Sequence, residues 1–234
     1  YELHTPKGVL LVGVPGCGKS FSAKMVASRW ELPLLRFDMG SVYAKYVGET
    51  ERRMQEALDY IGNVAPCVLW VDEIEKALAS SSDESDVGKR VLGQFLFWLQ
   101  ESPAKVFLVA TANDVSKLPP ELFRKGRFSE VFFVDLPNRA ERAEALRHYC
   151  KTSLHQEFSP QDIEVLVTST KGFSYSDIEQ SIKDYAERVA FGHAPAPDAS
   201  TLATHFDSVV SISEANEGIA QIRAWGREHA ISAS

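Results

Sequence analysis

One segment of eight residues has the spacing of a phosphate-binding loop. Gly13-Val14-Pro15-Gly16-Cys17-Gly18-Lys19-Ser20 matches G-x-x-x-x-G-K-[ST], follows an apolar run and opens a helical pattern. Its glycines allow backbone N–H groups to point at phosphate oxygens near a helix N-terminus. The specificity of the spacing favours this interpretation over a merely structural glycine-rich turn. We predict a nucleotide site formed by Pro15 through Phe21, in which Lys19 holds the β- and γ-phosphates and Ser20 ligates Mg²⁺.

Two acidic residues, Asp72 and Glu73, follow a later apolar run, Val68-Leu69-Trp70-Val71. Acids at the end of a buried strand are costly unless a metal or solvent meets them, and parallel sheets bind ligands at the carboxyl ends of their strands. We predict that Asp72 holds the Mg²⁺ shell and that Glu73 polarises the attacking water. Capping of the next helix is the alternative role for Asp72. Because the chain also has a complete phosphate-binding loop, the metal role of Asp72 is favoured. The loop at 13–20 and the acidic segment at 68–73 together predict ATP hydrolysis.

The elements that must position these residues are short apolar runs separated by helical patterns. Continuous apolar runs between helices are typical of a parallel sheet covered on both faces. The expected strands are 9–12, 34–37, 67–71, 106–110 and 131–134. Helical patterns fall at 19–30, 54–61 and 91–99. We therefore expect a large α/β nucleotide-binding domain over residues 1–137.

A purely helical pattern follows Leu136-Pro137. The periodicity recurs at 139–150, 160–170, 174–191 and 211–228. Ser159-Pro160 and Ser174 are expected helix starts, and the stretch 192–200, rich in Ala and Pro, is an expected loop. We therefore expect a small all-helical domain over residues 138–234.

The composition narrows the function classes. The chain of 234 residues is 44% hydrophobic, enough for a buried core, and its formal charge of −7 argues against a general nucleic-acid binder. No apolar run has the length of a bilayer span. Cys17, Cys67 and Cys150 form neither a disulfide framework nor a zinc pattern, which favours a reducing compartment. The start at Tyr1, without Met, leads us to expect a fragment of a longer protein.

The motifs together resemble the AAA family of the AAA+ ATPases over nearly the whole chain. Thr111-Ala112-Asn113 resembles the family's sensor 1, which implies that Asn113 orients the attacking water. Residues 122–128, Leu-Phe-Arg-Lys-Gly-Arg-Phe, resemble the R-x-G-R-[FI] box. The resemblance implies that Arg124 and Arg127 reach the nucleotide of a neighbouring subunit as arginine fingers, which stabilise transition-state charge only in an assembled ring. Two solvated arginines on a loop are the alternative.

A further segment, Lys45-Tyr46-Val47-Gly48-Glu49, follows the second expected strand, where the family carries pore loop 1. The resemblance implies that Lys45, Tyr46, Val47 and Gly48 grip a polypeptide, with Tyr46 supplying contact area and Gly48 the turn. Outside the family frame, Tyr46 and Val47 are ordinary core residues. The Ser-rich stretch 79–86 corresponds in position to pore loop 2.

Residues 172–179, Gly-Phe-Ser-Tyr-Ser-Asp-Ile-Glu, resemble the family's G-x-S-G-A-[DE]-[IL] segment, which implies contacts to adenine and ribose. Tyr175-Ser176 replaces the small Gly-Ala pair, and the segment has no arginine, so no sensor 2 arginine is predicted. Cys17 stands where many AAA proteins have Thr. A redox-sensitive thiol is one interpretation, and a small residue that fits the loop is the favoured one.

Several stretches are more specifically similar to the hypothetical chloroplast reading frame 46 type of cyanobacteria, plastids and other bacteria. They are residues 5–14, 32–36, 65–73 and 222–227. This resemblance implies an additional N-terminal region and a cytoplasmic location, in the bacterial cytosol or the plastid stroma.

The resemblance implies a Mg²⁺-dependent ATPase that assembles into a homo-oligomer, a hexamer, and acts on a protein substrate. Our first hypothesis is a ring subunit that remodels or unfolds proteins. The alternative is an ATP-dependent switch or scaffold that regulates a partner without threading it. A DNA-directed motor is disfavoured, because the chain is acidic and has no basic stripe.

Overall fold

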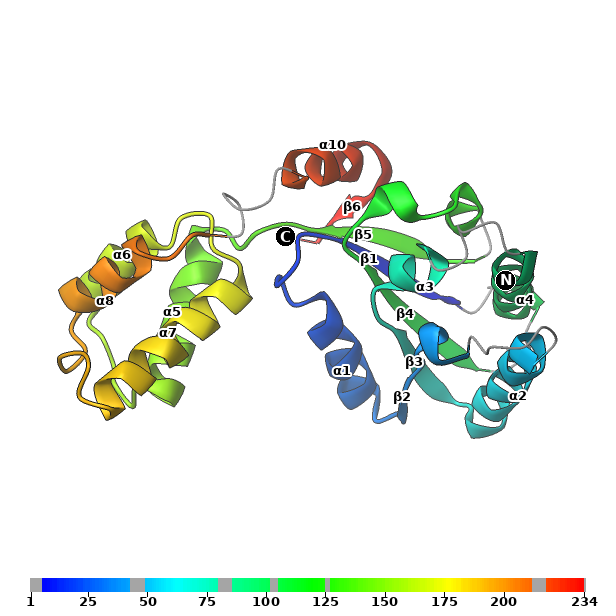
Figure 1. The fold of residues 1–234 in the computed structure, drawn as a ribbon, viewed down its shortest axis with the longest axis horizontal. Coiled ribbons are helices and arrows are strands. Elements are labelled where there is room, and N and C mark those ends of the chain that lie inside the picture. The colour runs from blue at the N-terminus through cyan, green and yellow to red at the C-terminus, as the bar shows by residue number, and fades with distance from the viewer. Residues whose placement is uncertain are drawn as a thin grey trace. The chain divides into compact units, whose positions relative to one another are not determined.

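The computed structural model describes residues 6–42, 49–79, 86–101, 105–124, 127–211 and 218–233. By residue contacts the chain forms two compact units, shown in Figure 1. The sheet unit comprises Tyr1–Gly13, Lys19–Val134 and Ile222–Ser234, and the helical unit comprises Val14–Gly18 and Asp135–Gln221.

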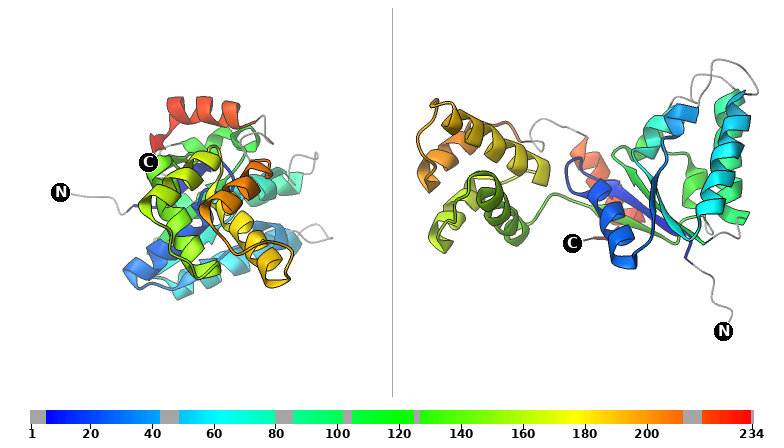
Figure 2. Two further views of the ribbon diagram at one scale, coloured as in Figure 1. Left: turned by 90° about the vertical axis from the view of Figure 1, so that its left-hand side faces the viewer. Right: turned by 90° about the horizontal axis from the view of Figure 1, so that it is seen from below.

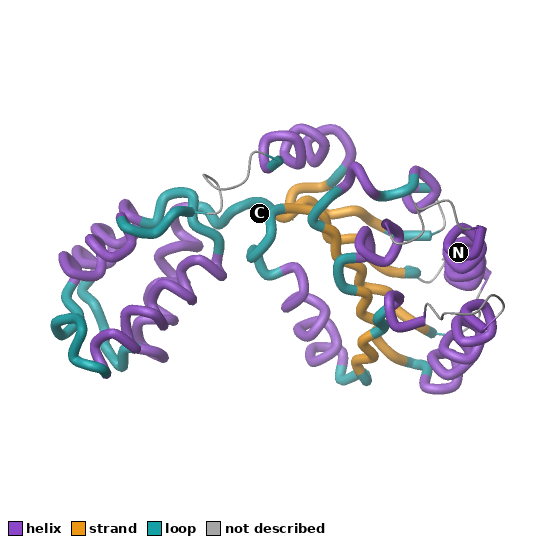
Figure 3. Tube along the Cα trace, in the orientation of Figure 1, coloured by secondary structure: helices purple, strands orange, loops and turns teal. Residues whose placement is uncertain are grey.

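The sheet unit is built on a sheet of six strands in the order β2-β3-β4-β1-β5-β6. Every pair of neighbours is parallel, and Figure 3 shows the strands side by side in orange. The strands are β1 (Gly8–Gly13), β2 (Leu34–Arg36), β3 (Cys67–Val71), β4 (Val106–Ala112), β5 (Glu130–Val134) and β6 (Ile231–Ser232). This confirms the expected α/β fold with a parallel sheet. β6 was not predicted, because two residues carry no periodicity.

Helices cover both faces of the sheet (Figure 2). α1 (Lys19–Trp30) packs Ala23 and Ala27 against Leu11 and Val109 on one face. On the other face Leu10 packs in a second core with residues of α2 (Glu49–Val64), α3 (Ile74–Ala79) and α4 (Asp86–Glu101). Leu10 and Leu11 point to opposite faces because side chains alternate along a strand. Short 3₁₀ turns complete the unit: η1 (Met39–Val42), η2 (Val115–Lys117) and η3 (Pro120–Phe123).

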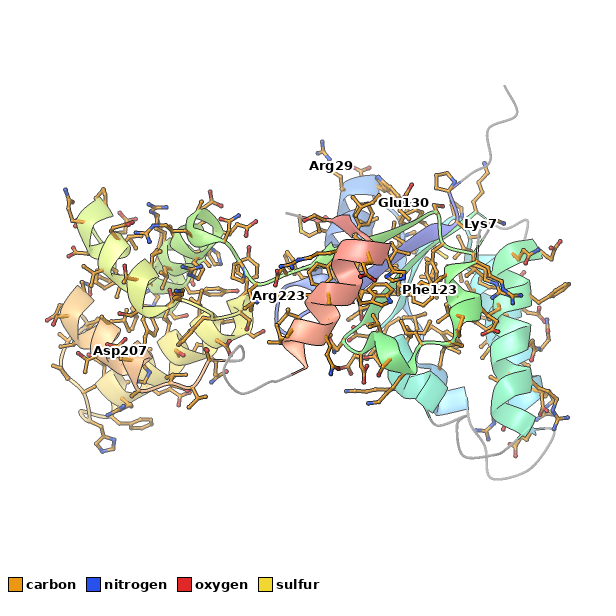
Figure 4. The ribbon with its side chains drawn as sticks, turned by 90° about the horizontal axis from the view of Figure 1, so that it is seen from above. Lys7, Arg29, Phe123, Glu130, Asp207 and Arg223 are labelled. Carbon is orange, nitrogen blue, oxygen red and sulfur yellow. The ribbon has the colours of Figure 1, made fainter. Side chains whose placement is uncertain are left out.

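The C-terminal segment packs on the sheet. In α10 (Ile219–His229) the ring of Trp225 lies 5.3 Å from that of Phe123, and Figure 4 shows Phe123 beside this helix. After α10 the chain adds β6 next to β5, and Ala233 N–H donates to the Phe133 carbonyl over 2.9 Å. Residues 222–233 therefore belong by contact with the sheet, whereas the sequence placed them in a helical domain. The division into domains at residue 137 stays a prediction.

The helical unit contains α5 (Arg139–Ser153), α6 (Pro160–Ser169), α7 (Tyr175–Ala190) and α8 (Ala199–Asp207). Each helix begins with a capping box, in which the N-cap side chain and the third helical residue satisfy each other's backbone N–H groups. The N-caps are Asn138, Ser159, Ser174 and Asp198. Ser159 and Ser174 confirm the expected helix starts. α8 was not predicted, because its first two residues fall in the expected loop and its nine residues give only a short periodic pattern.

No helix in the described part of the chain is both long and apolar enough to cross a membrane. Cys17, Cys67 and Cys150 are buried, and they are not joined by disulfides.

Two helical glycines give a matched test of this packing. A Cβ on Gly226 of α10 would lie 2.4 Å from the ring of buried Phe133, whereas one on Gly93 of α4 would meet nothing within 4 Å. We expect Gly226→Ala to lower stability by about 1–3 kcal/mol through overpacking, and Gly93→Ala to raise it by about 0.5–1 kcal/mol through helix propensity. Thermal denaturation followed by circular dichroism measures both. Shifts of the same sign would contradict the packing of α10 on β5.

Candidate nucleotide site

The phosphate-binding loop connects β1 to α1 and has the backbone that its glycines predict. Gly13 and Gly18 have φ angles of 152° and 87°. A Cβ on Gly13 would lie 1.9 Å from the Val134 carbonyl oxygen, whereas one on Gly18 would meet nothing within 4 Å. Glycine is therefore required at position 13 by close packing, and at position 18 by the left-handed backbone.

Lys19 is the first residue of α1 and is only 5% exposed. Its ammonium Nζ donates to the Gly13 carbonyl oxygen over 2.8 Å. A buried ammonium is stable only when it is well paired, so the lysine is held against the loop that it follows in sequence. The positive charge thus lies at the N-terminus of α1, where the helix dipole also favours an anion.

Asp72 follows β3 and is the meeting point of three elements. One oxygen of its carboxylate, Oδ1, accepts hydrogen bonds from Ser20 Oγ of α1 and from Thr111 Oγ1 of β4, each over 2.7 Å. A hydroxyl beside a carboxylate is the oxygen donor set that Mg²⁺ takes when waters and phosphates complete its octahedron. Within the described ranges no group of three or more His, Cys, Asp or Glu residues could hold a metal ion. The hydroxyl of Ser20 and the carboxylate of Asp72 fit a Mg²⁺ ion whose remaining ligands come from phosphate and water.

Glu73, the next residue, has a positive φ of 48°, which few non-glycine residues adopt. Its backbone N–H donates to Thr111 Oγ1 over 2.9 Å. Its carboxylate is held from two sides: Oε1 accepts from Asn113 Nδ2 over 3.0 Å, and Oε2 lies 2.6 Å from Lys76 Nζ. The ion pair raises the pKa of Lys76. The predicted catalytic glutamate and the predicted sensor 1 asparagine are thus brought into contact.

The sequence analysis assigned no role to three residues of this arrangement, although one of them, Thr111, lies in the segment that resembles sensor 1. Thr111 is fully buried and binds both acids through one hydroxyl. Glu75 is 4% exposed and accepts the Asn113 backbone N–H over 2.9 Å. Burial raises the pKa of the Glu75 carboxyl, the bond from Asn113 opposes this, and the nearby Glu73 adds to it. A polar residue inside the apolar β4 was the available signal for Thr111, whereas nothing in the sequence distinguished Glu75 and Lys76 from exposed helix residues.

The remaining predicted site residues lie apart from this cluster or outside the described residues. Arg124 is exposed at the end of η3, and the Arg127 guanidinium donates to the Glu121 carbonyl oxygen. Within the described part of the chain neither arginine bonds to Asp72, Glu73 or Asn113. Lys45, Tyr46, Val47 and Gly48 lie outside the described residues.

The other residues predicted to bind the nucleotide are described. Phe21 is 61% exposed on α1, and Cys17 is buried with Sγ 3.7 Å from the Pro15 carbonyl oxygen. Within the helical unit the Ser176 N–H donates to the Gly16 carbonyl oxygen over 3.1 Å. The segment predicted to contact adenine and ribose therefore touches the phosphate-binding loop.

Comparison with known proteins decides the family. The ATPase family associated with various cellular activities (AAA) matches residues 9–136. This chain belongs to the AAA family of ATPases. Membership implies nucleotide binding and ATP hydrolysis, and it confirms the resemblance drawn from the motifs.

Relatives refine this placement of the AAA domain. The "Uncharacterized AAA domain-containing protein ycf46" of Guillardia theta is 40% identical over 228 residues, covering 96% of this chain and 45% of the relative. The "Proteasome-activating nucleotidase" of Thermococcus onnurineus is 31% identical over 183 residues, covering 76% of this chain and 45% of the relative. The chain thus spans less than half of either relative. The structure of the FIGL-1 AAA domain in complex with ADP superimposes with a TM-score of 0.77 at 21% identity, covering 96% of this chain and 79% of that one, and shows the same fold.

The Thr111 hydroxyl provides the first test of the site in this AAA domain. Thr111→Val removes the donor to Asp72 and the acceptor for the Glu73 N–H, and each unsatisfied buried group costs about 1–3 kcal/mol. We expect ATP turnover to fall about 10-fold to 100-fold, because Asp72 and Glu73 would no longer be held in position by the hydroxyl. Thr111→Ser is the control, because it keeps the hydroxyl and most of the rate. Equal rates in the two variants, measured by phosphate release, would contradict the role of the hydroxyl.

Proposed function

We propose that this AAA domain hydrolyses Mg²⁺-bound ATP as a subunit of a ring that remodels or unfolds proteins. The observation that carries the ATPase part is the set of contacts around Asp72 and Glu73. One acid is bound to the serine that follows Lys19, and the next is bound to Asn113. This is the arrangement that phosphoryl transfer to water requires: a cation site, a water-polarising carboxylate and an amide beside it.

The residues divide the chemical work as follows. MgATP, when bound, supplies the phosphoryl group that water attacks. Lys19 and the loop N–H groups stabilise the phosphate charge, and Ser20 and Asp72 hold Mg²⁺. Glu73 accepts a hydrogen bond from the attacking water and takes up the water's proton as the oxygen bonds to phosphorus. General-base catalysis of this kind contributes about 10²–10⁴ in rate. Asn113 orients both the carboxylate and the water.

The ring part of the proposal rests on Arg124 and Arg127. Among the described residues neither arginine bonds to Asp72 or Glu73 of its own chain, although the family motif that they match places both arginines at a nucleotide. A role in the neighbouring subunit's site reconciles these observations, and an arginine supplied in trans contributes about 10³–10⁵ in rate. We further propose that the ring is a homo-hexamer and that Tyr46 and its neighbours grip a polypeptide in the pore.

Two features support a protein as the substrate. A 31% identical relative is named for activating the proteasome, which ties its nucleotide turnover to a protein machine. The formal charge of −7 disfavours nucleic acid as the substrate. The alternative function is an ATP-dependent switch or scaffold that binds a partner without threading it. For either function we propose the bacterial cytosol or plastid stroma as the location.

The shared-site proposal predicts a concentration-dependent ATPase. We expect the specific activity to climb with protein concentration, and Arg127→Ala mixed with wild type to lower the rate below the weighted mean of the two. Arg29→Ala is a suitable control, since Arg29 is exposed in the last turn of α1 (Figure 4). A flat rate that the mutant does not poison would mean that each subunit hydrolyses alone, and would favour the switch.

The threading part makes a separate prediction about Tyr46. We expect Tyr46→Ala to abolish unfolding of a model protein substrate while ATP turnover falls far less, because the role proposed for this side chain is to grip the substrate and not to bind nucleotide. Tyr60→Ala is the matched control, since Tyr60 is 64% exposed on α2. Processing is measured as ATP-dependent loss of fluorescence from a folded reporter. Retained processing in the Tyr46 variant would favour the switch or scaffold.

A further inference from the structure

One buried acid of the site has no role in the chemistry described above. Glu75 lies in the first turn of α3, where exposed acids are ordinary, yet only 4% of the residue is exposed. Its neighbour in the helix, Ile74, is fully buried in the sheet core and fixes the start of α3. A buried carboxylate is costly unless it is hydrogen-bonded, so packing alone does not account for a glutamate here.

The one hydrogen bond that Glu75 accepts from another element leads back to the catalytic centre. Glu75 Oε1 accepts the backbone N–H of Asn113, which lies just beyond the end of β4. The amide of the same asparagine donates to Glu73 Oε1 over 3.0 Å. The contacts therefore run from Glu75 through the Asn113 backbone and side chain to the Glu73 carboxylate.

We propose that Glu75 is a positioning residue for ATP hydrolysis, whose carboxylate anchors the Asn113 backbone so that the asparagine amide holds Glu73. The proposal rests on the proposed function, because it acts only through Glu73. Two different contacts would then hold the Glu73 carboxylate in place. Lys76 binds its Oε2 at the exposed surface, and the buried Glu75–Asn113 contact fixes the partner of its Oε1.

The second oxygen of Glu75, Oε2, indicates that Glu75 acts as a hydrogen-bond acceptor more than as a negative charge. Oε2 is buried and has no hydrogen-bond partner among the described residues. A carboxylate required for its charge would be expected to have both oxygens hydrogen-bonded. Burial and the charge of Glu73 both raise the pKa of this carboxyl, which also disfavours the ionised form. What the site uses is Oε1, in place to receive the Asn113 N–H.

The test compares variants that keep or remove that acceptor. Glu75→Gln keeps a carbonyl oxygen at the Oε1 position without the charge, whereas Glu75→Leu and Glu75→Met keep the volume without an acceptor. We expect kcat to fall on the order of 10²-fold in the apolar variants, because a misplacement of about 1 Å has that effect. The KM for ATP is expected to stay near the wild-type value, since the lost interaction belongs to the transition state. Glu75→Gln is expected to recover most of the rate.

Nucleotide binding and thermal midpoints measured on the same preparations separate positioning from folding. An apolar variant that is folded, binds ATP and turns over at the wild-type rate would overturn the inference, as would a Gln variant as slow as Leu and Met. Two apolar variants are included so that a folding failure in one leaves the other to decide. Glu73→Gln is the reference: a normal rate in that variant would overturn the proposed function together with this inference, whereas an inactive Glu73→Gln beside an active Glu75→Leu would overturn the inference alone.

Discussion

The site depends on a single oxygen atom, Asp72 Oδ1, which accepts a hydrogen bond from Ser20 on one side and from Thr111 on the other. Charged oxygens are stable at the end of a buried strand only when donors surround them. Here the donors come from α1 and β4, so satisfying the carboxylate also fixes the helix that carries Lys19 and the strand that leads to Asn113. The order of the sheet makes this possible, because β4 lies between β1 and β3 and all three strands run in the same direction.

The sequence predicted the parts of this arrangement that depend on neighbouring residues. The glycines, Lys19 and Ser20 form one contiguous segment, and the family frame located Asn113. What it could not predict are hydrogen bonds between residues far apart in the chain, such as Thr111 with Asp72 or Glu75 with Asn113. Threonine in a strand and glutamate in the first turn of a helix both look ordinary by local propensity. Their contacts with Asp72 and Asn113 form only when the register of the sheet brings β3 and β4 together.

The same reasoning explains the fold elements that were missed. The strands of the central sheet were predicted because burial on both faces gives long apolar runs. β6 has only two residues, and it exists because α10 returns the chain to the free edge of β5. That return depends on Gly226, where any side chain would meet the Phe133 ring. A short strand set by distant packing leaves no periodic pattern, so its prediction would require the tertiary structure first.

Glu75 is a residue of the site that lowers the stability of the folded chain at neutral pH. Its pKa in the folded chain is raised above the ordinary glutamate value, so the folded state binds its proton more tightly than the unfolded state does. By linkage, this residue's contribution to stability is largest below the ordinary pKa and declines as the pH rises through the raised one. At neutral pH the buried carboxyl therefore costs stability when it ionises, whereas an apolar residue of the same volume would have no such cost. A core selected for stability alone would therefore place leucine or methionine at position 75. The proposed reaction accounts for a half-satisfied acid beside Asn113, since Glu75 binds the backbone N–H of Asn113 and the side-chain amide of the same residue holds Glu73, the proposed catalytic glutamate.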